Sequence, residues 1–343
     1  MMGDNNFMVE LVSLDDIRAA QRRISGVAVR TGLYRVEPER LRAAGAAELP
    51  FELWIKAESE QPIGSFKLRG AYNCIAQLSE KQLSRGVITY SSGNHAQGVA
   101  FAARALGAKA VIVMPDNAPA TKIAATKELG AEVVLVGPAS SERKAKAEEL
   151  AADFGYTIVP PYDDPAIIAG QATCGLEILE QLGVSTDPGG SVVILSPVSG
   201  GGLLSGIAAA VKLSGAAGVQ VWGAEPELAA DAKESFDTKT LVEWPAAKTT
   251  RTISDGLRTQ SLGTLNFEHI VRFVDGIVTV SEDEIVAAVR VMLETTGLVA
   301  EPSGAVTLAA ALFHHADLPD CQRMVAVLSG GNIEPELARS LAT

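Results

Sequence analysis

Short runs rich in valine and isoleucine alternate with segments of helical spacing through most of this chain. The predicted strands cover residues 87–90, 110–114, 132–136, 157–159, 192–195, 220–223, 276–280 and 324–328. Buried strands separated by helices of about ten residues are typical of parallel sheets with crossover helices. The pattern therefore predicts an α/β fold of two open, twisted, mostly parallel sheets with flanking helices.

The first four of these strands form a series of their own, which interrupts a longer one that includes a short strand at 53–56. We expect a small domain over residues 80–163, inserted into a larger domain made of residues 1–79 and 164–343. A chain of 343 residues is long enough for two such units.

Charge and composition argue against several classes of partner. The net charge of −12 and the lack of a basic run speak against nucleic acid and anionic membrane surfaces. No apolar run approaches the ~20 residues of a membrane-spanning helix, and the first residues lack the pattern of a signal peptide. The three cysteines are scattered, which fits a reducing compartment. We therefore expect a cytoplasmic protein.

The stretch 62–71 places a lysine where a helix is expected to open. Ser65 is the predicted N-cap, so Lys67 lies in the first turn, where the helix dipole disfavours a cation. An isolated lysine of this kind is usually a solvated side chain. The alternative is a lysine of lowered pKa that forms a Schiff base with a carbonyl cofactor.

Gly200-Gly201-Gly202-Leu203 follows the strand 192–195 and opens a helix. Converging backbone N–H groups at a helix N-terminus suit an anion such as phosphate. A dinucleotide site is a competing interpretation, because Glu225 lies about twenty residues further on, at the end of the next strand. The third glycine of the dinucleotide pattern, Gly206, comes one position late. A structural tight turn also remains open.

Two further strand-to-helix turns carry polar side chains at the edge where α/β sheets bind ligands. The turn 91–98 presents two hydroxyls, an amide and an imidazole, which suits a carboxylate or is plain capping chemistry. The turn 329–332, Ser-Gly-Gly-Asn, ends the last strand and has a simple glycine turn as its alternative.

In this order, these segments resemble the serine/threonine dehydratase and serine racemase family, pyridoxal-phosphate (PLP) enzymes of fold type II. The resemblance extends from about residue 13 to residue 335 and includes a Glu-Pro-Ser-Gly segment at 301–304. One departure is Ser199, which precedes three glycines where the family often has four. Homodimerisation is implied by the family alone.

The resemblance implies roles for individual residues. Lys67 would form the Schiff base, Phe66 would pack on the pyridine ring, and Asn94 would bind the phenolic oxygen. The loop Gly200, Gly201, Gly202 and Leu203 would hold the phosphate, Ser329 would face the pyridine nitrogen, and Gly256 would line the pocket. Ser91, Ser92, Asn94, His95 and Arg143 would lie near the carboxylate of an amino-acid substrate.

The implied reaction is β-elimination from L-threonine or L-serine, giving a 2-oxo acid and ammonia. Serine racemisation is the close alternative, because Ser92 occupies the position of the second acid/base in racemases. Elimination from 3-hydroxyaspartate also fits, and Arg258 could meet its second carboxylate. A nicotinamide dehydrogenase or a non-catalytic amino-acid-binding protein would leave Lys67 unexplained.

The segment 225–231 resembles the family's cation site. Glu225, the carbonyl of Ala229 and Asp231 would supply oxygen ligands to Mg²⁺ or Ca²⁺, which prefer such donors. A pair of solvated carboxylates is the alternative.

Overall fold

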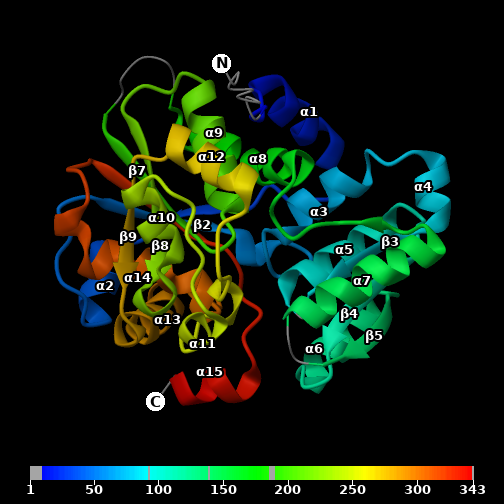
Figure 1. Ribbon diagram of the computed structural model, residues 1–343. Helices are drawn as coiled ribbons and strands as arrows, with labels where there is room; N and C mark the ends of the chain where they lie inside the picture. The colour runs from blue at the N-terminus through cyan, green and yellow to red at the C-terminus, as the bar shows by residue number, and fades with distance from the viewer. Residues whose placement is uncertain (1–9, 92, 138–139, 185–189, 342–343) are drawn as a thin grey trace, which may run out of the picture.

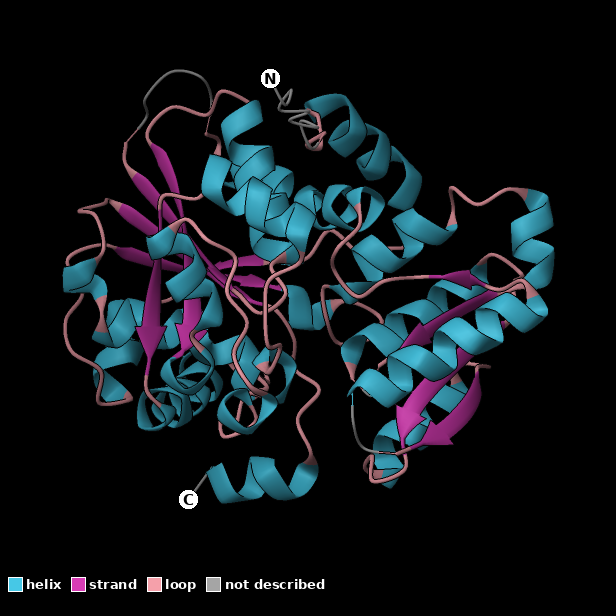
Figure 2. Ribbon diagram, in the orientation of Figure 1, coloured by secondary structure: helices cyan, strands magenta, loops and turns pink. Residues whose placement is uncertain are grey.

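The computed structural model describes residues 10–91, 93–137, 140–184 and 190–341. Two sheets lie side by side, each with helices on both faces (Figures 1 and 2). The larger sheet has the strand order β1 (Leu33–Arg35), β2 (Glu52–Ala57), β10 (Arg323–Leu328), β7 (Val192–Pro197), β8 (Val219–Pro226) and β9 (Gly276–Val280). Only the β1–β2 pair of this described sheet is antiparallel.

The smaller sheet is parallel throughout its described strands. Its order is β5 (Glu132–Val136), β4 (Ala110–Pro115), β3 (Val87–Tyr90) and β6 (Thr157–Ile158). All four strands lie within the segment expected to form the small domain. The predicted strands of both series are therefore present, with ends shifted by at most three residues.

Helices cover both faces of the larger sheet, and alternate residues of its strands explain why. In β7, Val193 and Leu195 pack with α13 (Glu282–Thr296) and α14 (Pro302–Phe313). Val192 and Ile194 face α8 (Pro165–Leu182), α9 (Gly202–Leu213) and α12 (Thr264–Phe273). A strand that is buried on both faces must be apolar at every position, as the valine- and isoleucine-rich runs are.

The smaller sheet is covered in the same way. Ile112 and Met114 of β4 pack on the side of α5 (Asn94–Ala105), whereas Val111 and Val113 pack on the side of α7 (Ser140–Phe154). Helix α3 (Lys67–Ile75) contacts both α5 and α8, so it joins the two halves of the molecule (Figure 1).

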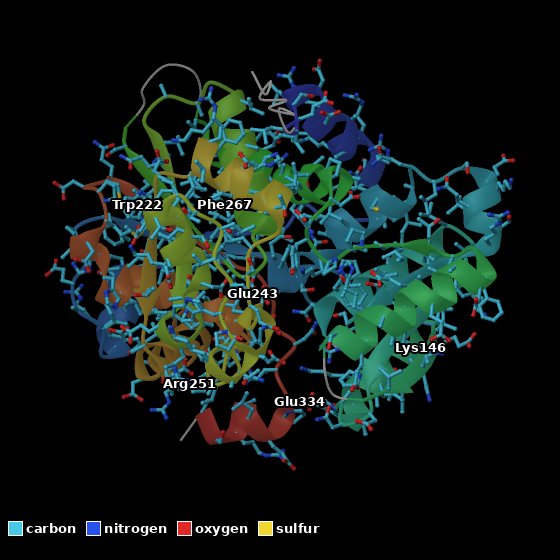
Figure 3. All side chains as sticks on the ribbon, in the orientation of Figure 1. Lys146, Trp222, Glu243, Arg251, Phe267 and Glu334 are labelled. Carbon is cyan, nitrogen blue, oxygen red and sulfur yellow. The ribbon has the colours of Figure 1, made fainter. Side chains whose placement is uncertain are left out.

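The remaining elements are shorter or peripheral. They are α1 (Leu14–Ile24), α2 (Pro38–Ala43), α4 (Glu80–Arg85), α6 (Ala120–Glu128), α10 (Asp231–Thr238), α11 (Ala246–Thr249), α15 (Pro335–Leu341) and the 3₁₀ turns η1 (Glu58–Glu60), η2 (Glu227–Ala229), η3 (Asp255–Leu257) and η4 (His315–Asp317). Thr121 of α6 donates a hydrogen bond at 3.0 Å to Glu334, which lies just before α15 (Figure 3). Within the described ranges, no helix has both the length and the apolar character needed to cross a bilayer.

One local expectation was wrong. Ser65 is not the N-cap of α3: the helix begins at Lys67 after Phe66, because the backbone of Ser65 pairs with Gly330. The stretch 232–264, for which the sequence pattern predicted no element, contains most of α10 and all of α11 and leads into α12.

Candidate active site

The lysine turn and the turn after β10 form one paired unit. Ser65 and Gly330 make an antiparallel bridge, and the N–H of Phe66 donates to the carbonyl oxygen of Ser329 at 3.0 Å. The pairing brings Lys67, at the start of α3, beside the last strand of the larger sheet. Two segments more than 250 residues apart thus meet at one point.

The amine of Lys67 is held inside the protein. Its Nζ donates to the carbonyl oxygen of Pro161 at 2.8 Å and lies 5.1 Å from the centre of the Phe66 ring. Burial lowers the pKa of this amine to about 8. At pH 7 about a tenth of the side chain is then neutral, compared with a negligible part for an ordinary lysine. Burial and the lowered pKa favour the second of the two interpretations of this lysine over a solvated side chain.

The glycine loop at the start of α9 is shaped as an anion cradle. Gly201 has a φ of +95° at the N-cap of α9, and a Cβ at Gly200 would collide with the ring of Tyr162. Within the described part of the chain, the N–H groups of residues 201–204 donate to no other group. Free N–H groups at a helix N-terminus attract an anion, so the loop fits the phosphate of PLP.

Asn94 connects the turn before α5 with the end of the larger sheet. Its Oδ1 accepts a hydrogen bond from Nδ2 of Asn332 at 2.7 Å, and its Nδ2 donates to Oε1 of Glu301 at 2.6 Å. A Cβ at Gly330 would lie 3.1 Å from this Nδ2, which locates Asn94 directly beside the turn paired with Lys67. The side-chain amide of Asn94 is therefore oriented by Asn332 at its oxygen and by Glu301 at its nitrogen.

Glu301 is a site residue to which sequence reasoning assigned no role. The side chain is 5% exposed, and burial, together with the charge of Asp255, raises the pKa of its carboxyl to about 8. The feature of the sequence that could have identified Glu301 is its position as an acidic residue directly before an apolar helix, which begins at Pro302. Tyr162, which covers the glycine loop, was also missed.

The described residues that were predicted to bind the substrate lie at two places, the turn before α5 with the start of that helix, and the first turn of α7. The hydroxyl of Ser91 accepts a hydrogen bond from the N–H of Gly93 at 3.3 Å, in the turn before α5. Ser92 lies outside the described residues. Arg143 lies in the first turn of α7, half-buried, and this burial lowers its pKa.

His95 lies close to Lys67, but its ring is turned toward the chain that returns from the smaller sheet. Nε2 donates to the carbonyl oxygen of Val159 at 3.1 Å. Burial, together with the charge of Lys67, lowers the pKa of the imidazole to about 3. A neutral, buried His95 is therefore suited to hold the walls of the site together.

The other predicted cofactor residues line the same edge of the sheet. Ser329 is nearly buried, and its hydroxyl makes no hydrogen bond to any described residue, which leaves it available to a ring nitrogen. Leu203 is buried in the first turn of α9. The N–H of Gly256 donates to Oγ of Ser303 at 2.9 Å, which ties η3 to the start of α14.

The predicted cation site holds two buried carboxylates. Glu225 accepts hydrogen bonds from the N–H groups of Ala232 (3.3 Å) and Lys233 (2.9 Å), whereas Oδ2 of Asp231 is buried without a partner among the described residues. Burial raises the pKa of both carboxyls, that of Asp231 to about 7. The unpartnered oxygen and the all-oxygen donor set fit a hard cation.

This set has only two carboxylates, so a cation would also need the carbonyl of Ala229, which lies between them in η2. No group of three or more His, Cys, Asp and Glu side chains that could hold a metal ion occurs among the residues the structure describes.

Comparisons with known proteins agree with this geometry. Residues 33–330 match the model of a protein family described as pyridoxal-phosphate dependent enzyme. The L-threo-3-hydroxyaspartate ammonia-lyase of Saccharomyces cerevisiae is 39% identical over 283 residues, which cover 82% of this chain and 83% of the yeast protein. The serine racemase of Schizosaccharomyces pombe is 37% identical over 335 residues, which are 98% of each chain.

A solved structure supports the same relationship. The threonine deaminase of T.th. superposes with a TM-score of 0.83 at 42% identity, over 94% of this chain and 99% of that one. The likeness confirms the predicted fold class of two mostly parallel sheets with flanking helices.

Proposed function

The chain belongs to the family of pyridoxal-phosphate-dependent enzymes, and from this premise we propose that it eliminates the β-hydroxyl group of L-threonine, L-serine or both. The products would be a 2-oxo acid and ammonia. The observation that carries the proposal is the buried amine of Lys67. It donates to the Pro161 carbonyl, next to the Tyr162 that covers Gly200, and the adjacent Phe66 pairs with Ser329. PLP dependence leaves no part for a nicotinamide cofactor.

The residues that would hold the cofactor each match one of its groups. Lys67 would bind the aldehyde carbon, the N–H groups of residues 201–203 the phosphate, and Asn94 the phenolic oxygen. Ser329 would face the pyridine nitrogen, with Phe66 against the ring and Gly256 lining the pocket. When bound, the cofactor supplies an electron sink for the charge left on the substrate α-carbon.

Proton transfer falls to Lys67. The buried amine of Lys67 has a pKa near neutral pH, so its Nζ would be able to take the substrate α-proton and pass it on. The neutral hydroxyl of Ser329 would leave the pyridine nitrogen largely unprotonated, because it carries no negative charge to stabilise a cation. The bound cofactor would then supply only a moderate electron sink, which would suit loss of the β-hydroxyl.

We assign substrate binding to the expected small domain, residues 80–163. Ser91, Ser92 and Arg143 would receive the substrate carboxylate, and His95 would shape that wall. A homodimer and a cytoplasmic location are part of the same proposal. The yeast relative is named for 3-hydroxyaspartate, which has a second carboxylate. To bind that group, Arg258 would have to give up the hydrogen bond that its Nε donates at 2.9 Å to the carbonyl of Thr252.

The carboxylates of Glu225 and Asp231, with the Ala229 carbonyl, would hold Mg²⁺ or Ca²⁺. The support is the buried, unpartnered Oδ2 of Asp231 and the raised pKa of both carboxyls, since a bound cation offsets the cost of burying two like charges.

Borohydride reduction and peptide mapping test the lysine. The wild-type protein should carry a pyridoxyl group on Lys67, and Lys67→Ala should lose both the visible absorbance and the activity. Turnover near the wild-type rate in Lys67→Ala would refute the assignment.

A substrate panel tests the reaction. We expect L-threonine and L-serine to release a 2-oxo acid faster than 3-hydroxyaspartate does. If L-serine gives D-serine in excess of pyruvate, the enzyme is a racemase, the activity named for the fission-yeast relative.

A further inference from the structure

Helix α12 lies directly behind the glycine loop. Its residue Asn266 is fully buried, and Nδ2 donates to the carbonyl oxygen of Gly200 at 2.9 Å. The N–H of Gly263, at the N-cap of α12, donates to the same oxygen at 3.1 Å. One carbonyl of the loop is thus held by two donors from the start of a helix that is remote in the sequence.

Because the peptide bond is planar, the contact at the Gly200 carbonyl also fixes the direction of the Gly201 N–H. In a trans peptide the C=O and the following N–H point in opposite directions. Because the Gly200 carbonyl is fixed toward α12, the N–H of Gly201 must point away from α12. That N–H donates to no described group, so it is available to a ligand on the side of the loop that faces away from α12.

The loop also rests on Asn266 sterically. A Cβ at Gly201 would lie 2.9 Å from the Cβ of Asn266, so the backbone of Gly201 is in close contact with this side chain. The hydroxyl of Ser205, one turn into α9, donates to the Asn266 carbonyl at 3.2 Å. Asn266 therefore contacts the start of α9 through its side chain and its backbone.

The position of α12 is set by the chain that returns from the smaller sheet. The carboxylate of Asp163 accepts hydrogen bonds from the N–H groups of Thr264 (3.1 Å) and Leu265 (2.9 Å) at the helix N-terminus. In the two preceding residues, Tyr162 covers Gly200 and the Pro161 carbonyl accepts from Lys67. Three consecutive residues thus contact the lysine, the loop and the helix behind the loop.

We propose that Asn266 is a positioning residue for phosphate recognition: its amide fixes the Gly200–Gly201 peptide so that the Gly201 N–H faces the cofactor phosphate. The inference rests on the proposed assignment of the 200–203 loop to phosphate. Oδ1 of Asn266 is buried without a partner among the described residues, so the side chain leaves one polar atom unpaired while it makes this hydrogen bond.

Phosphate-bearing and phosphate-free cofactors separate this role from a structural one. Full-length apoprotein is titrated with PLP, pyridoxal and inorganic phosphate, for the wild type, Asn266→Ala and the nearly isosteric Asn266→Asp. Loss of one hydrogen bond should weaken PLP and phosphate binding about three- to tenfold in Asn266→Ala. Asn266→Asp should weaken both further, because it adds a negative charge behind the loop. Pyridoxal binding should stay unchanged in both variants.

His269→Ala is the matched control. His269 lies one turn further along α12, is also fully buried, and accepts a hydrogen bond from the Val12 N–H at 3.0 Å rather than touching the loop. It should lower the thermal stability of the apoprotein and leave the ratio of PLP to pyridoxal affinity at the wild-type value. If Asn266→Ala does not fold, the test uses Asn266→Asp: its PLP affinity and the ³¹P chemical shift of its bound PLP are compared with those of the wild type.

Two results would overturn the inference. The first is an unchanged PLP affinity in folded Asn266 variants, and the second is an equal loss of PLP and pyridoxal affinity. A wild-type protein that does not prefer PLP to pyridoxal would overturn the phosphate assignment and this inference with it. Failure of the proposed elimination reaction would instead appear as a wild-type protein that binds PLP and releases no 2-oxo acid.

Discussion

The buried carboxyl of Glu301 should make the stability of this protein depend on pH in a defined direction. Its pKa is about 8 in the folded chain, against an ordinary value of 4.5, and burial is the main cause. Between these two values the folded protein holds a proton that the unfolded chain has released. Folding therefore loses stability as the pH rises from about 4.5 to about 8, and the substitution Glu301→Gln removes this loss.

The magnitude follows from the shift. At 1.36 kcal/mol per pKa unit, the cost of Glu301 is ~1 kcal/mol at pH 5, ~3 kcal/mol at pH 7 and ~5 kcal/mol at pH 9. Glutamine cannot titrate, but its Oε1 can still accept the hydrogen bond from Asn94. Relative to the wild type, Glu301→Gln should gain ~4 kcal/mol in free energy of unfolding between pH 5 and pH 9.

Urea unfolding of the apoproteins at pH 5, 7 and 9 measures this gain without a contribution from the cofactor. Any difference in packing between the two side chains adds a constant, so the dependence on pH is the quantity to compare. Glu336→Gln, which removes an exposed carboxylate on α15, is the control and should show no such trend. A gap between wild type and Glu301→Gln that is constant over this range, or that narrows as the pH rises, would refute the reasoning.

Two other buried sites give further predictions. Arg69 is fully buried and pairs with Glu58 and Glu177, each at 2.7 Å. Glu177 keeps a second partner in Lys56, so Arg69→Met should cost ~3–5 kcal/mol in urea unfolding chiefly by leaving the buried carboxylate of Glu58 without an ion pair. The exposed Arg30, replaced in the same way, should cost less than ~1 kcal/mol, and equal losses would contradict this account. At the cation site, Asp231→Asn should abolish any rise in melting temperature that Mg²⁺ or Ca²⁺ gives the wild type; an undiminished rise would exclude this residue as a ligand.

Local features of the site were largely readable from the sequence. The glycines at 200–202 lead into a helix as expected, and the last strand ends directly before Ser329. These features depend on neighbouring residues, whose spacing and backbone preferences are written in the chain itself. Ser65 was misjudged because its partner, Gly330, is remote in sequence.

The contacts that build the site were not readable in this way. Lys67 meets the Pro161 carbonyl across 94 residues, Asn94 meets Glu301 across 207, and Asn266 meets Gly200 across 66. Helix α12, which carries Asn266, was missed as well.

By itself, the sequence determined the alternation of buried strands and helices and the chemistry available at each strand end. Only the tertiary structure decided which strand ends are neighbours, and so which lysine, amide and carboxyl are buried together. The physical reason is that periodicity records whether a residue faces the interior, whereas strand order records which part of the interior it faces. The pKa values of Lys67 and Glu301 depend on that second fact, because burial by remote segments shifts both toward neutral pH.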